Sequence, residues 1–313
     1  MYSTVYWEIS GVCNGNCPYC VTGKNCVIGR NMEDIKARKF ISIDDFRETI
    51  KHLIETQTIV PGQTTLSLFN WGEPFLHPEL ESILSIICEH NLRYIISTNC
   101  SILKILPPHL LRNCERVIFS MSGFSQDSYN RIHGFDFEAV KRNLVSMVII
   151  WRKSGYTGTF NISFHVYQFN ITEIPYIKLF AKELNIECSP IFATLNGFKL
   201  MEAFRNKTMS YDQMEKTRSE LITYFYKDLS STPDRIEHCS QFDILTINEY
   251  CELLPCCGVE RGLAVYSFGD IRKMSLQEII QTKKNADFCK LCIKSGLLKY
   301  GESILTRPVQ YYP

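Results

Sequence analysis

Three cysteines lie close together near the start of the chain, in the stretch CNGNCPYC at residues 13–20. Cys13, Cys17 and Cys20 are separated by three and then two residues, so one loop can present three thiolates. Such soft ligands suit zinc or an iron–sulfur cluster. The spacing therefore predicts either a zinc site completed by a fourth ligand, for which Cys26 is the local candidate, or a cubane cluster with one iron left open.

A second group of cysteines lies far downstream, where six of the fourteen cysteines fall between Cys239 and Cys292. A reducing cytoplasm argues against a disulfide framework, so metal binding or thiol chemistry is the expected use of this group. The cysteines outside the two groups are expected to be small buried hydrophobes: Cys26, Cys88, Cys100, Cys114 and Cys188.

The overall composition is ordinary for a cytoplasmic globular protein, with 45% hydrophobic and 21% charged residues. A formal charge of +1 gives no sign of a nucleic-acid-binding surface. The opening residues, MYSTVYWEIS, lack the charged and apolar regions of a signal peptide. The most apolar stretch, VSMVIIW, is too short to span a bilayer. We therefore expect a cytoplasmic protein with neither a nucleic-acid nor a membrane partner.

Short apolar runs alternate with helical patterns over about the first 195 residues. Six runs read as strands: 5–10, 64–70, 93–98, 116–121, 161–169 and 186–193. Helical patterns between them cover residues 44–56, 78–90, 105–113, 137–153 and 174–184. Repeated strand–helix units fold as a parallel sheet with right-handed crossovers. Six units predict an α/β fold with a partial, open (β/α)6 TIM-like barrel.

Four unusual loops follow the first four predicted strands. They are CNGNCPYC, NWGEP, STN and SMSG, in chain order. In parallel α/β folds the chemistry lies at the carboxyl ends of the strands. We therefore expect these four loops to share one rim of the barrel and to form a single site there.

These stretches, in this order, resemble the radical S-adenosylmethionine (SAM) superfamily over about residues 5–195. CNGNCPYC is similar to the family's CxxxCxxC signature. The resemblance implies that Cys13, Cys17 and Cys20 hold a [4Fe–4S] cluster whose open iron binds SAM. It also places Tyr19 near the adenine of SAM. Local Cys26 tests this interpretation, because a metal bound by Cys26 together with the triplet would leave no open iron.

The later loops extend the resemblance. NWGEP is similar to the family's GGEP motif, with Trp71 replacing the first glycine. Gly72 would allow close backbone approach, and Glu73 would accept a hydrogen bond from the SAM ammonium. STNCS resembles STNG, which assigns a cofactor contact to Asn99 and puts Cys100 where glycine is usual.

The fourth loop, SMSGFSQDSYNR, resembles the family's SxDG…R stretch. The resemblance implies cofactor contacts from Ser120 and Arg131, whose guanidinium fork suits a carboxylate, and from Ser122, which stands where Asp is common. Gln168 and Asn170 are further rim candidates. The resemblance assigns the catalytic roles to Glu73 and Arg131.

The C-terminal cysteines resemble the SPASM/twitch extension that follows many radical SAM domains. The turn glycine of that pattern would be replaced by Cys251, and GDI at 269–271 is similar to the family's GNI. No cysteine follows Cys292, so the shorter twitch form with one auxiliary [4Fe–4S] cluster fits better. The implied ligands are Cys239, Cys256, Cys289 and Cys292, with Cys257 as the alternative to Cys256. A structural zinc site with the same thiolates is the competing interpretation.

The expected organisation is a barrel at residues 1–200, a helical linker at 201–236, and a small cysteine-rich α+β twitch domain at 237–313. The helical pattern at 209–229 belongs mostly to this linker.

The resemblance implies an enzyme that reductively cleaves SAM, with flavodoxin or ferredoxin as electron donor. The radical would abstract hydrogen from an unactivated C–H bond of a peptide or a small molecule. With an auxiliary cluster, an oxidation or a peptide modification in a biosynthetic pathway is expected. An epimerase that uses a thiol as hydrogen donor is the alternative, with Cys100, Cys188, Cys251 and Cys257 as candidate donors. A non-enzymatic zinc-binding module is the alternative from another class.

Overall fold

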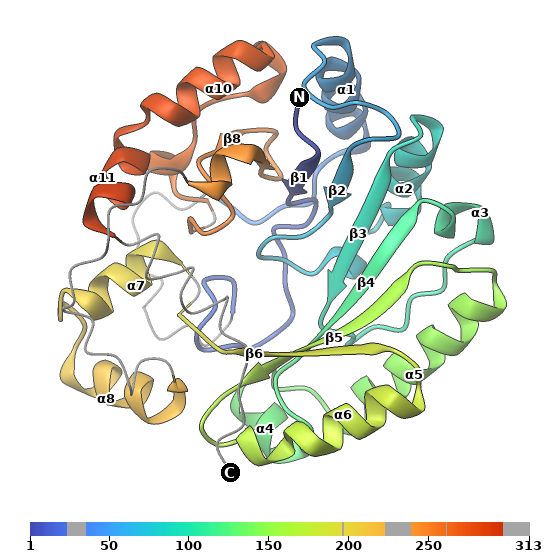
Figure 1. Ribbon diagram of the computed structural model, residues 1–313, viewed down its shortest axis with the longest axis vertical. Helices are drawn as coiled ribbons and strands as arrows, with labels where there is room; N and C mark the ends of the chain where they lie inside the picture. Colours follow the sequence, from blue (N-terminus) through green and yellow to red (C-terminus); the bar gives the residue numbers. More distant parts are fainter. Residues whose placement is uncertain (24–35, 196, 223–238, 261, 297–313) are drawn as a thin grey trace.

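The alternation of strands and helices expected from the sequence is present in the computed structural model (Figure 1). The structure describes residues 1–23, 36–195, 197–222, 239–260 and 262–296. Its strands are β1 (Thr4–Trp7), β2 (Thr65–Ser67), β3 (Arg93–Thr98), β4 (Cys114–Met121), β5 (Thr159–Val166), β6 (Glu187–Phe192), β7 (Ile244–Ile247) and β8 (Leu253–Leu254). Its α-helices are α1 (Ile43–Glu55), α2 (Leu80–Glu89), α3 (Pro108–Leu111), α4 (Gln126–Arg131), α5 (Phe137–Lys153), α6 (Ile174–Glu183), α7 (Phe198–Arg205), α8 (Tyr211–Glu220), α10 (Leu276–Asn285) and α11 (Asp287–Ser295).

The six predicted strands form one parallel sheet. The order in space is β6-β5-β4-β3-β2-β1, and each neighbouring pair is parallel. Helices α1, α2, α5 and α6 lie along the outside of the curved sheet (Figure 1). This mixed α/β architecture confirms the predicted fold class and is consistent with a partial TIM-like barrel.

The sheet does not end at β1. Strand β7 pairs with β1 in parallel, with Ile244 opposite Thr4, and β8 then pairs with β7 in antiparallel fashion. The sequence pattern indicated short strands in this region but assigned them to a separate small domain. Pairing with β7 satisfies the edge of β1, whose backbone groups would otherwise be open. The segment after residue 239 is therefore joined to the barrel by backbone hydrogen bonds.

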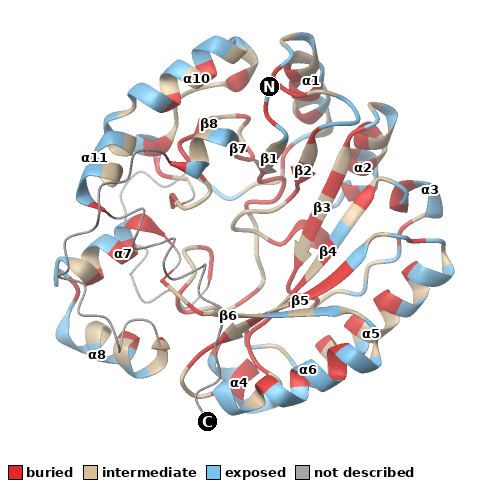
Figure 2. Cartoon of the chain, viewed as in Figure 1, coloured by how far each residue is buried: buried red, intermediate tan, exposed pale blue. Residues whose placement is uncertain are grey.

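Alternation along the strands separates the two faces of the sheet. In β4, Val117, Phe119 and Met121 are fully buried and belong to the main hydrophobic core. The residues between them, Ile118 and Ser120, are only partly buried and face the inside of the barrel. The sheet therefore turns these apolar side chains outward onto the helices and leaves its inner face free to line a site. Figure 2 marks the buried and partly buried residues along the strands.

A second hydrophobic cluster closes the inner side. It includes Tyr19 and Tyr167 from the barrel, Phe198 and Met201 from α7, and Cys256 from the C-terminal segment. These side chains come from segments more than two hundred residues apart. The inner face of the barrel is therefore bounded on one side by α7 and the C-terminal segment.

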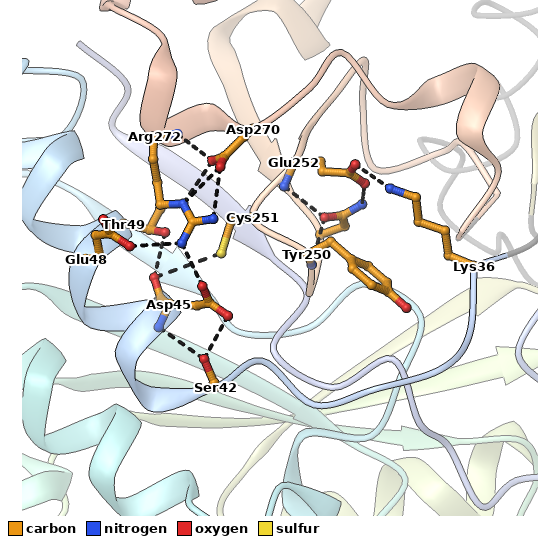
Figure 3. Close-up of polar contacts among 11 residues, drawn as sticks. Lys36, Ser42, Asp45, Glu48, Thr49, Tyr250, Cys251, Glu252, Asp270 and Arg272 are labelled. Atoms are coloured by element: carbon orange, nitrogen blue, oxygen red, sulfur yellow. Dashed lines mark hydrogen bonds and ion pairs between the residues drawn. The ribbon is translucent and has the colours of Figure 1, made fainter.

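Polar contacts also attach the C-terminal segment to the barrel (Figure 3). Arg272 is three-quarters buried and pairs with Asp45 of α1 at 2.6 Å and with Asp270 at 2.9 Å. It reaches Glu48, one helical turn further along α1, at 3.0 Å. Lys36 pairs with Glu252 beside this network. One arginine thus connects the C-terminal segment to the first helix of the barrel.

Four features named from the sequence fall wholly or partly outside the described residues. These are Cys26, the last seven residues of the helical pattern at 209–229, the end of the predicted linker, and both ends of the predicted domain at 237–313. Within the described part of that pattern, α8 begins after a capping box formed by Ser210 and Gln213.

Candidate functional site

A cavity of about 480 Å³ opens on the inner face of the barrel. Eight of the residues assigned to the site from the sequence line it: Cys13, Cys17, Tyr19, Cys20, Gly72, Glu73, Asn99 and Ser120. They come from the loops after β1, β2 and β3 and from the end of β4. The rim expected from parallel-sheet geometry therefore exists, and the cysteine triplet lies on it.

The triplet loop is held by its neighbours. Its Asn16 N–H donates to the carbonyl of His133 at 3.0 Å, and the Asn14 side chain bonds to Ser101 at 2.9 Å. A Cβ added to Gly15 would lie 3.5 Å from the Cys17 sulfur and 3.6 Å from the Cys13 sulfur. The thiols of Cys13 and Cys17 thus lie close to Gly15, in the cavity that Cys20 also lines.

The electrostatics of the triplet fit a positively charged group. Burial, together with the nearby Cys20 and Cys13 thiols, raises the pKa of Cys17 well above its usual range. Burial raises the pKa of Cys13 to about 11, and the Glu73 carboxylate adds to the shift. Three thiolates in this place need a cation to stabilise them.

Among the described residues, no three His, Cys, Asp or Glu side chains are arranged to hold a single metal ion. A cubane cluster binds each thiolate at a separate iron, so its ligands need not converge on one point. The donor set and its burial therefore fit a cluster.

Glu73 is a buried carboxylate with three hydrogen-bond donors. One oxygen accepts from the Thr98 hydroxyl at 2.8 Å and the Phe75 N–H at 3.0 Å. The other accepts from the Asn99 N–H at 2.7 Å. Burial raises the pKa of Glu73 to about 7. The three hydrogen bonds lower this pKa, but their effect is smaller than that of burial. A cation beside this carboxylate would hold it in its charged form.

Glycine is required at position 72 because the loop lies against the β1 strand end. A Cβ at Gly72 would come within 1.6 Å of the carbonyl oxygen of Ser10. The Gly72 N–H donates to the buried carboxylate of Glu8 at 3.0 Å, and the Trp71 N–H donates to the same oxygen. Trp71, which stands in the expected glycine position, donates from its ring to Val259 in the C-terminal segment at 2.9 Å.

Cys100 and Cys251 stand where the resemblance led us to expect glycines, and both have the backbone conformation that glycine favours. Their φ angles are +58° and +60°. Cys100 is fully buried behind Glu73 in the main core, and Cys251 contacts the Asp45 carbonyl of α1. Both thiols are therefore parts of the packing away from the cavity.

Three assigned residues do not line the cavity. Ser122 is fully buried, and its hydroxyl has no partner among the described residues. Arg131 lies with its guanidinium 3.8 Å from the Phe169 ring centre and bonds to Glu220 at 3.3 Å. Gln168 bonds through its backbone N–H to the Glu220 carbonyl at 2.9 Å. The further candidate Asn170 is also buried, and it braces the turn by bonding to Ser122 and Tyr167.

The sequence interpretation gave no role to several polar residues that line the cavity. Ser97, Ser163 and His165 project inward from β3 and β5, and His133 follows α4. Burial lowers the pKa of His165 to about 4 and that of His133 to about 3, so both imidazoles are neutral at physiological pH. The period-two alternation of strand residues could have identified Ser163 and His165 as inward-facing.

The C-terminal cysteines of the implied ligand set also come together, from three segments. Cys239 precedes a short 3-10 turn, Cys256 follows β8, and Cys289 and Cys292 lie on α11. Burial raises the pKa of Cys256 well above its usual range, and Cys257, Cys292 and Cys289 each add to it. Burial and nearby Cys239 raise the pKa of Cys289 to about 11.

A buried lysine lies among these cysteines. Lys283 of α10 is 1% exposed and donates to the carbonyl oxygens of Gln241, at 2.7 Å, and Ile244. Burial lowers the pKa of Lys283 to about 8, while the surrounding thiols, first those of Cys256 and Cys289, raise it. Anionic partners stabilise a buried ammonium, and these thiols would supply such partners when deprotonated.

Cys256 and Cys257 have different neighbours, although Cys257 also lies near Cys239 of the implied ligand set. Cys256 lies near both cysteines of α11, Cys289 and Cys292, and each of them raises its pKa. Cys257 lines the barrel cavity, and its thiol lies 3.4 Å from the side-chain oxygen of Gln241. Of the four cysteines named as possible hydrogen donors, Cys257 is the one in the cavity lining, whereas the others are absent from that lining as far as the structure describes the chain.

Comparison with known proteins gives one family and several similar folds. The sequence model described as "Radical SAM superfamily" matches residues 7–172. No curated protein sequence matches the chain. Among solved structures, native anSMEcpe with bound AdoMet is 18% identical, with a TM-score of 0.61 over 92% of this chain and 83% of that one.

Two further solved structures contain peptides. Native anSMEcpe with bound AdoMet and Cp18Cys peptide is 17% identical, with a TM-score of 0.58, and the match covers 93% of this chain and 83% of that one. SuiB of Streptococcus suis bound to the precursor peptide SuiA is 13% identical, with a TM-score of 0.58, and the match covers 94% of this chain and 67% of that one. At these identities the similarity shows a shared fold. In the described part of the chain, no helix combines the length and the apolarity needed to cross a membrane.

Proposed function

The chain belongs to the radical SAM superfamily, and on that premise we propose that it is an enzyme that reductively cleaves SAM. The resulting 5′-deoxyadenosyl radical abstracts a hydrogen atom from an unactivated C–H bond of a peptide or a small molecule. The observation that carries this proposal is the meeting of Cys13, Cys17, Cys20 and Glu73 in one cavity. Members of this superfamily are enzymes, which disfavours a non-enzymatic zinc-binding module.

Cys13, Cys17 and Cys20 would hold a [4Fe–4S] cluster. When bound, this cluster supplies the electron that splits SAM into methionine and the radical, drawn from a donor such as flavodoxin or ferredoxin. Thr98 and Asn99 hold the Glu73 carboxylate by hydrogen bonds, and this carboxylate would receive the ammonium group of SAM. Its burial strengthens an ion pair with that group, because little water competes for the charge. Tyr19 supplies an aromatic wall beside the triplet.

The cavity walls contribute orientation and exclude water. Apolar side chains of β6 and α7, such as Ile191, Phe192 and Met201, face the inner strands across the cavity. A closed apolar wall limits quenching of a radical by solvent. The neutral His165 and the hydroxyls of Ser120 and Ser163 offer hydrogen bonds without charge. These groups suit an uncharged part of a substrate or the ribose of SAM.

We further propose an auxiliary [4Fe–4S] cluster held by Cys239, Cys256, Cys289 and Cys292 in a twitch-type unit at residues 237–313. Lys283 supports this proposal, because a buried ammonium among thiols is stabilised when the thiols are anionic. The position of Cys256 toward α11 favours it over Cys257 as the fourth ligand. An auxiliary cluster could take up the second electron of an oxidation, either of a small molecule or during peptide modification.

Epimerisation is a second candidate function, and the place of Cys257 in the cavity lining favours it. The S–H bond of Cys257 would break and give its hydrogen atom to the substrate radical. The thiyl radical that remains would be returned to a thiol by one electron from a flavodoxin- or ferredoxin-class donor and one proton from solvent. A Cys257→Ala variant would then still cleave SAM but form no epimer, and the epimer formed in D₂O by the unchanged protein would carry deuterium.

The test of the main proposal is anaerobic reconstitution followed by reaction with dithionite and SAM. We expect a brown protein with about eight irons, roughly four per cluster, and release of 5′-deoxyadenosine measured by mass spectrometry. A protein that holds iron in both sites but releases none would overturn the proposal. Zinc in both sites, without an effect of SAM, would instead support the zinc-binding alternative.

A further inference from the structure

The end of α8 touches three residues that the sequence assigned to the cofactor. The Glu220 carboxylate accepts from the hydroxyl of Tyr19 and pairs with Arg131 at 3.3 Å. The Glu220 carbonyl accepts from the backbone N–H of Gln168 at 2.9 Å. The Gln168 side chain in turn bonds to the carbonyl of Arg218 at 2.5 Å. One glutamate thus connects α8 to the triplet loop, to the end of α4 and to the turn after β5.

Glu220 is well placed to fix side chains next to the cavity. Its side chain is 15% exposed, whereas Arg131 is 47% exposed, so the carboxylate is the inner partner of the pair. Tyr19, which lines the cavity, is almost fully buried with its ring 6.2 Å from that of Tyr167. Tyr167 stacks on Phe169 at 5.0 Å, and the guanidinium of Arg131 lies on that ring. The carboxylate therefore joins the two ends of one stacked group.

If Glu220 only stabilised α8, its side chain would make contacts within that helix, and in the described part of the chain it does not. Glu215, on the same helix, pairs only with Arg218 within the helix among the contacts described, and it remains half exposed. The Glu220 side chain instead makes its contacts across more than eighty residues of sequence. Leu221, next to it, is fully buried in the inner hydrophobic cluster and anchors this end of α8.

We propose that Glu220 is a positioning residue of the SAM site, which holds Tyr19 against the triplet and fixes Arg131. This inference rests on the proposed function. Glu220 lies beyond residues 7–172, the part of the chain matched by the family model, so the segment after the barrel completes the cofactor site. Glu220 is not among the cavity-lining residues described, and it acts through the two side chains that it contacts. A charge-assisted hydrogen bond of this kind contributes more than a neutral one.

The experiment compares Glu220→Gln with Glu215→Gln in the reconstituted full chain. Gln keeps the shape of the side chain and removes its charge. SAM binding is measured by equilibrium dialysis, and 5′-deoxyadenosine formation gives KM for SAM and kcat. We expect Glu220→Gln to raise the Kd and KM for SAM about tenfold, the scale of one charged hydrogen bond. We expect kcat to change less than about twofold, because the contact does not touch the reacting atoms.

The control variant, Glu215→Gln, should bind SAM with the same Kd as the unchanged protein. A double-mutant cycle with Arg131→Met separates positioning from general loosening. If Glu220 acts through Arg131, Glu220→Gln will weaken binding much less in the Arg131→Met background than alone. Equal effects in both backgrounds, or equal Kd values for Glu220→Gln and Glu215→Gln, would overturn the inference.

A third variant keeps the test decisive if Glu220→Gln does not fold. Tyr19→Phe removes the hydroxyl from this contact and leaves α8 unchanged. It should weaken SAM binding several-fold while iron content stays constant, and an unchanged Kd would count against the inference. If the unchanged protein itself neither binds SAM nor releases 5′-deoxyadenosine, the proposed function fails. Binding and release by the unchanged protein, with no effect of Glu220, would overturn the positioning role alone.

Discussion

The triplet and the C-terminal cysteine group differ in how the chain brings their thiols together. Cys13, Cys17 and Cys20 belong to one eight-residue loop, and all three face a cavity. The C-terminal thiols come from three separate segments and pack around the buried ammonium of Lys283. Near the triplet lies the buried carboxylate of Glu73, which a cation would stabilise. The C-terminal group instead contains a cation of the chain itself, the ammonium of Lys283.

This difference indicates different tasks. A loop that offers three thiols beside an open space and a buried carboxylate is suited to a cluster that binds a further cationic ligand. A site whose thiols come from three chain segments around a buried lysine is suited, in our proposal, to a cluster that exchanges only electrons. Trp71, which donates to Val259, and the β1–β7 pairing hold the two regions together.

The largest expected effect comes from removing the triplet. Replacement of Cys13, Cys17 and Cys20 by Ala should abolish 5′-deoxyadenosine formation and lower the iron content by about four atoms, one cubane cluster. The remaining iron would report the C-terminal site alone. Cys188→Ala, which removes a thiol of β6, is the control and should keep both properties. Residual SAM cleavage in the triple variant would contradict the assignment of the first site.

Removal of the two α11 cysteines should affect the C-terminal site and leave the triplet site intact. Cys289→Ala with Cys292→Ala should also lower iron by about four atoms, but SAM cleavage without substrate turnover should persist within about tenfold, a barrier change near 1.4 kcal/mol. Cys88→Ala, on α2, serves as the matched thiol control. Complete loss of folding would instead point to a structural metal site, and unchanged iron would exclude these two cysteines as ligands.

The buried carboxylate gives a pH-dependent prediction for the cluster-free protein. The pKa of Glu73 rises from 4.5 to about 7 on folding, so the folded state binds the proton more tightly. Its stabilising contribution is complete below pH 4.5 and is lost as the pH rises to about 7. In urea unfolding, the unchanged protein should lose on the order of 3 kcal/mol relative to Glu73→Gln across this range.

Glu81→Gln, at the exposed start of α2, is the control for this measurement and should follow the unchanged protein. If the Glu73→Gln curve also runs parallel to that of the unchanged protein, Glu73 does not take up a proton on folding. In the reconstituted protein, Glu73→Gln should in addition weaken SAM binding by about tenfold or more, because a charged partner of the ammonium is lost.

The charge of Lys283 is expected to affect the reduction potential of the C-terminal cluster alone. Lys283→Met should lower the reduction potential of the C-terminal cluster by on the order of 60 mV, a tenfold change for one electron, because the cation favours the more negative reduced state. The potential of the first cluster should stay constant. Lys284→Met, the exposed neighbour on α10, should affect neither cluster. Redox titrations monitored by electron paramagnetic resonance give the reduction potential of each cluster separately.

The smallest effect concerns the contact that fixes the C-terminal segment to α1. Arg272→Met removes the pairs with Asp45, Glu48 and Asp270. Because these groups are partly exposed, we expect a loss of about 1 kcal/mol, or about 2 °C in Tm. Arg47→Met, which removes an exposed pair between α1 and Glu89 of α2, should change Tm by less. A much larger loss for Arg272→Met would mean that the network, more than β1–β7 pairing, joins the regions.

The sequence determined the features that depend on short-range spacing. The triplet needs only one loop, and the strand–helix alternation over the first 195 residues dictates a parallel sheet whose loops share a rim. Gly72 was assigned to a close backbone approach, and the structure places it against the Ser10 carbonyl, a partner that the sequence did not name. The positive φ of Cys100 and Cys251 could likewise be expected from the glycines that they replace.

The tertiary structure alone decided which distant groups meet. Strand β7 pairs with β1 across about 240 residues, and no local pattern encodes that partner. Arg131 was assigned to the cofactor by its place in a motif, but its charge is paired with Glu220, whose position depends on how α8 packs. Cys256 and Cys257 are adjacent in sequence, and only the turn after β8 sends one toward α11 and the other to the cavity. Side-chain direction and long-range pairing are set by packing of the whole chain, whereas spacing within a loop is already present in the sequence.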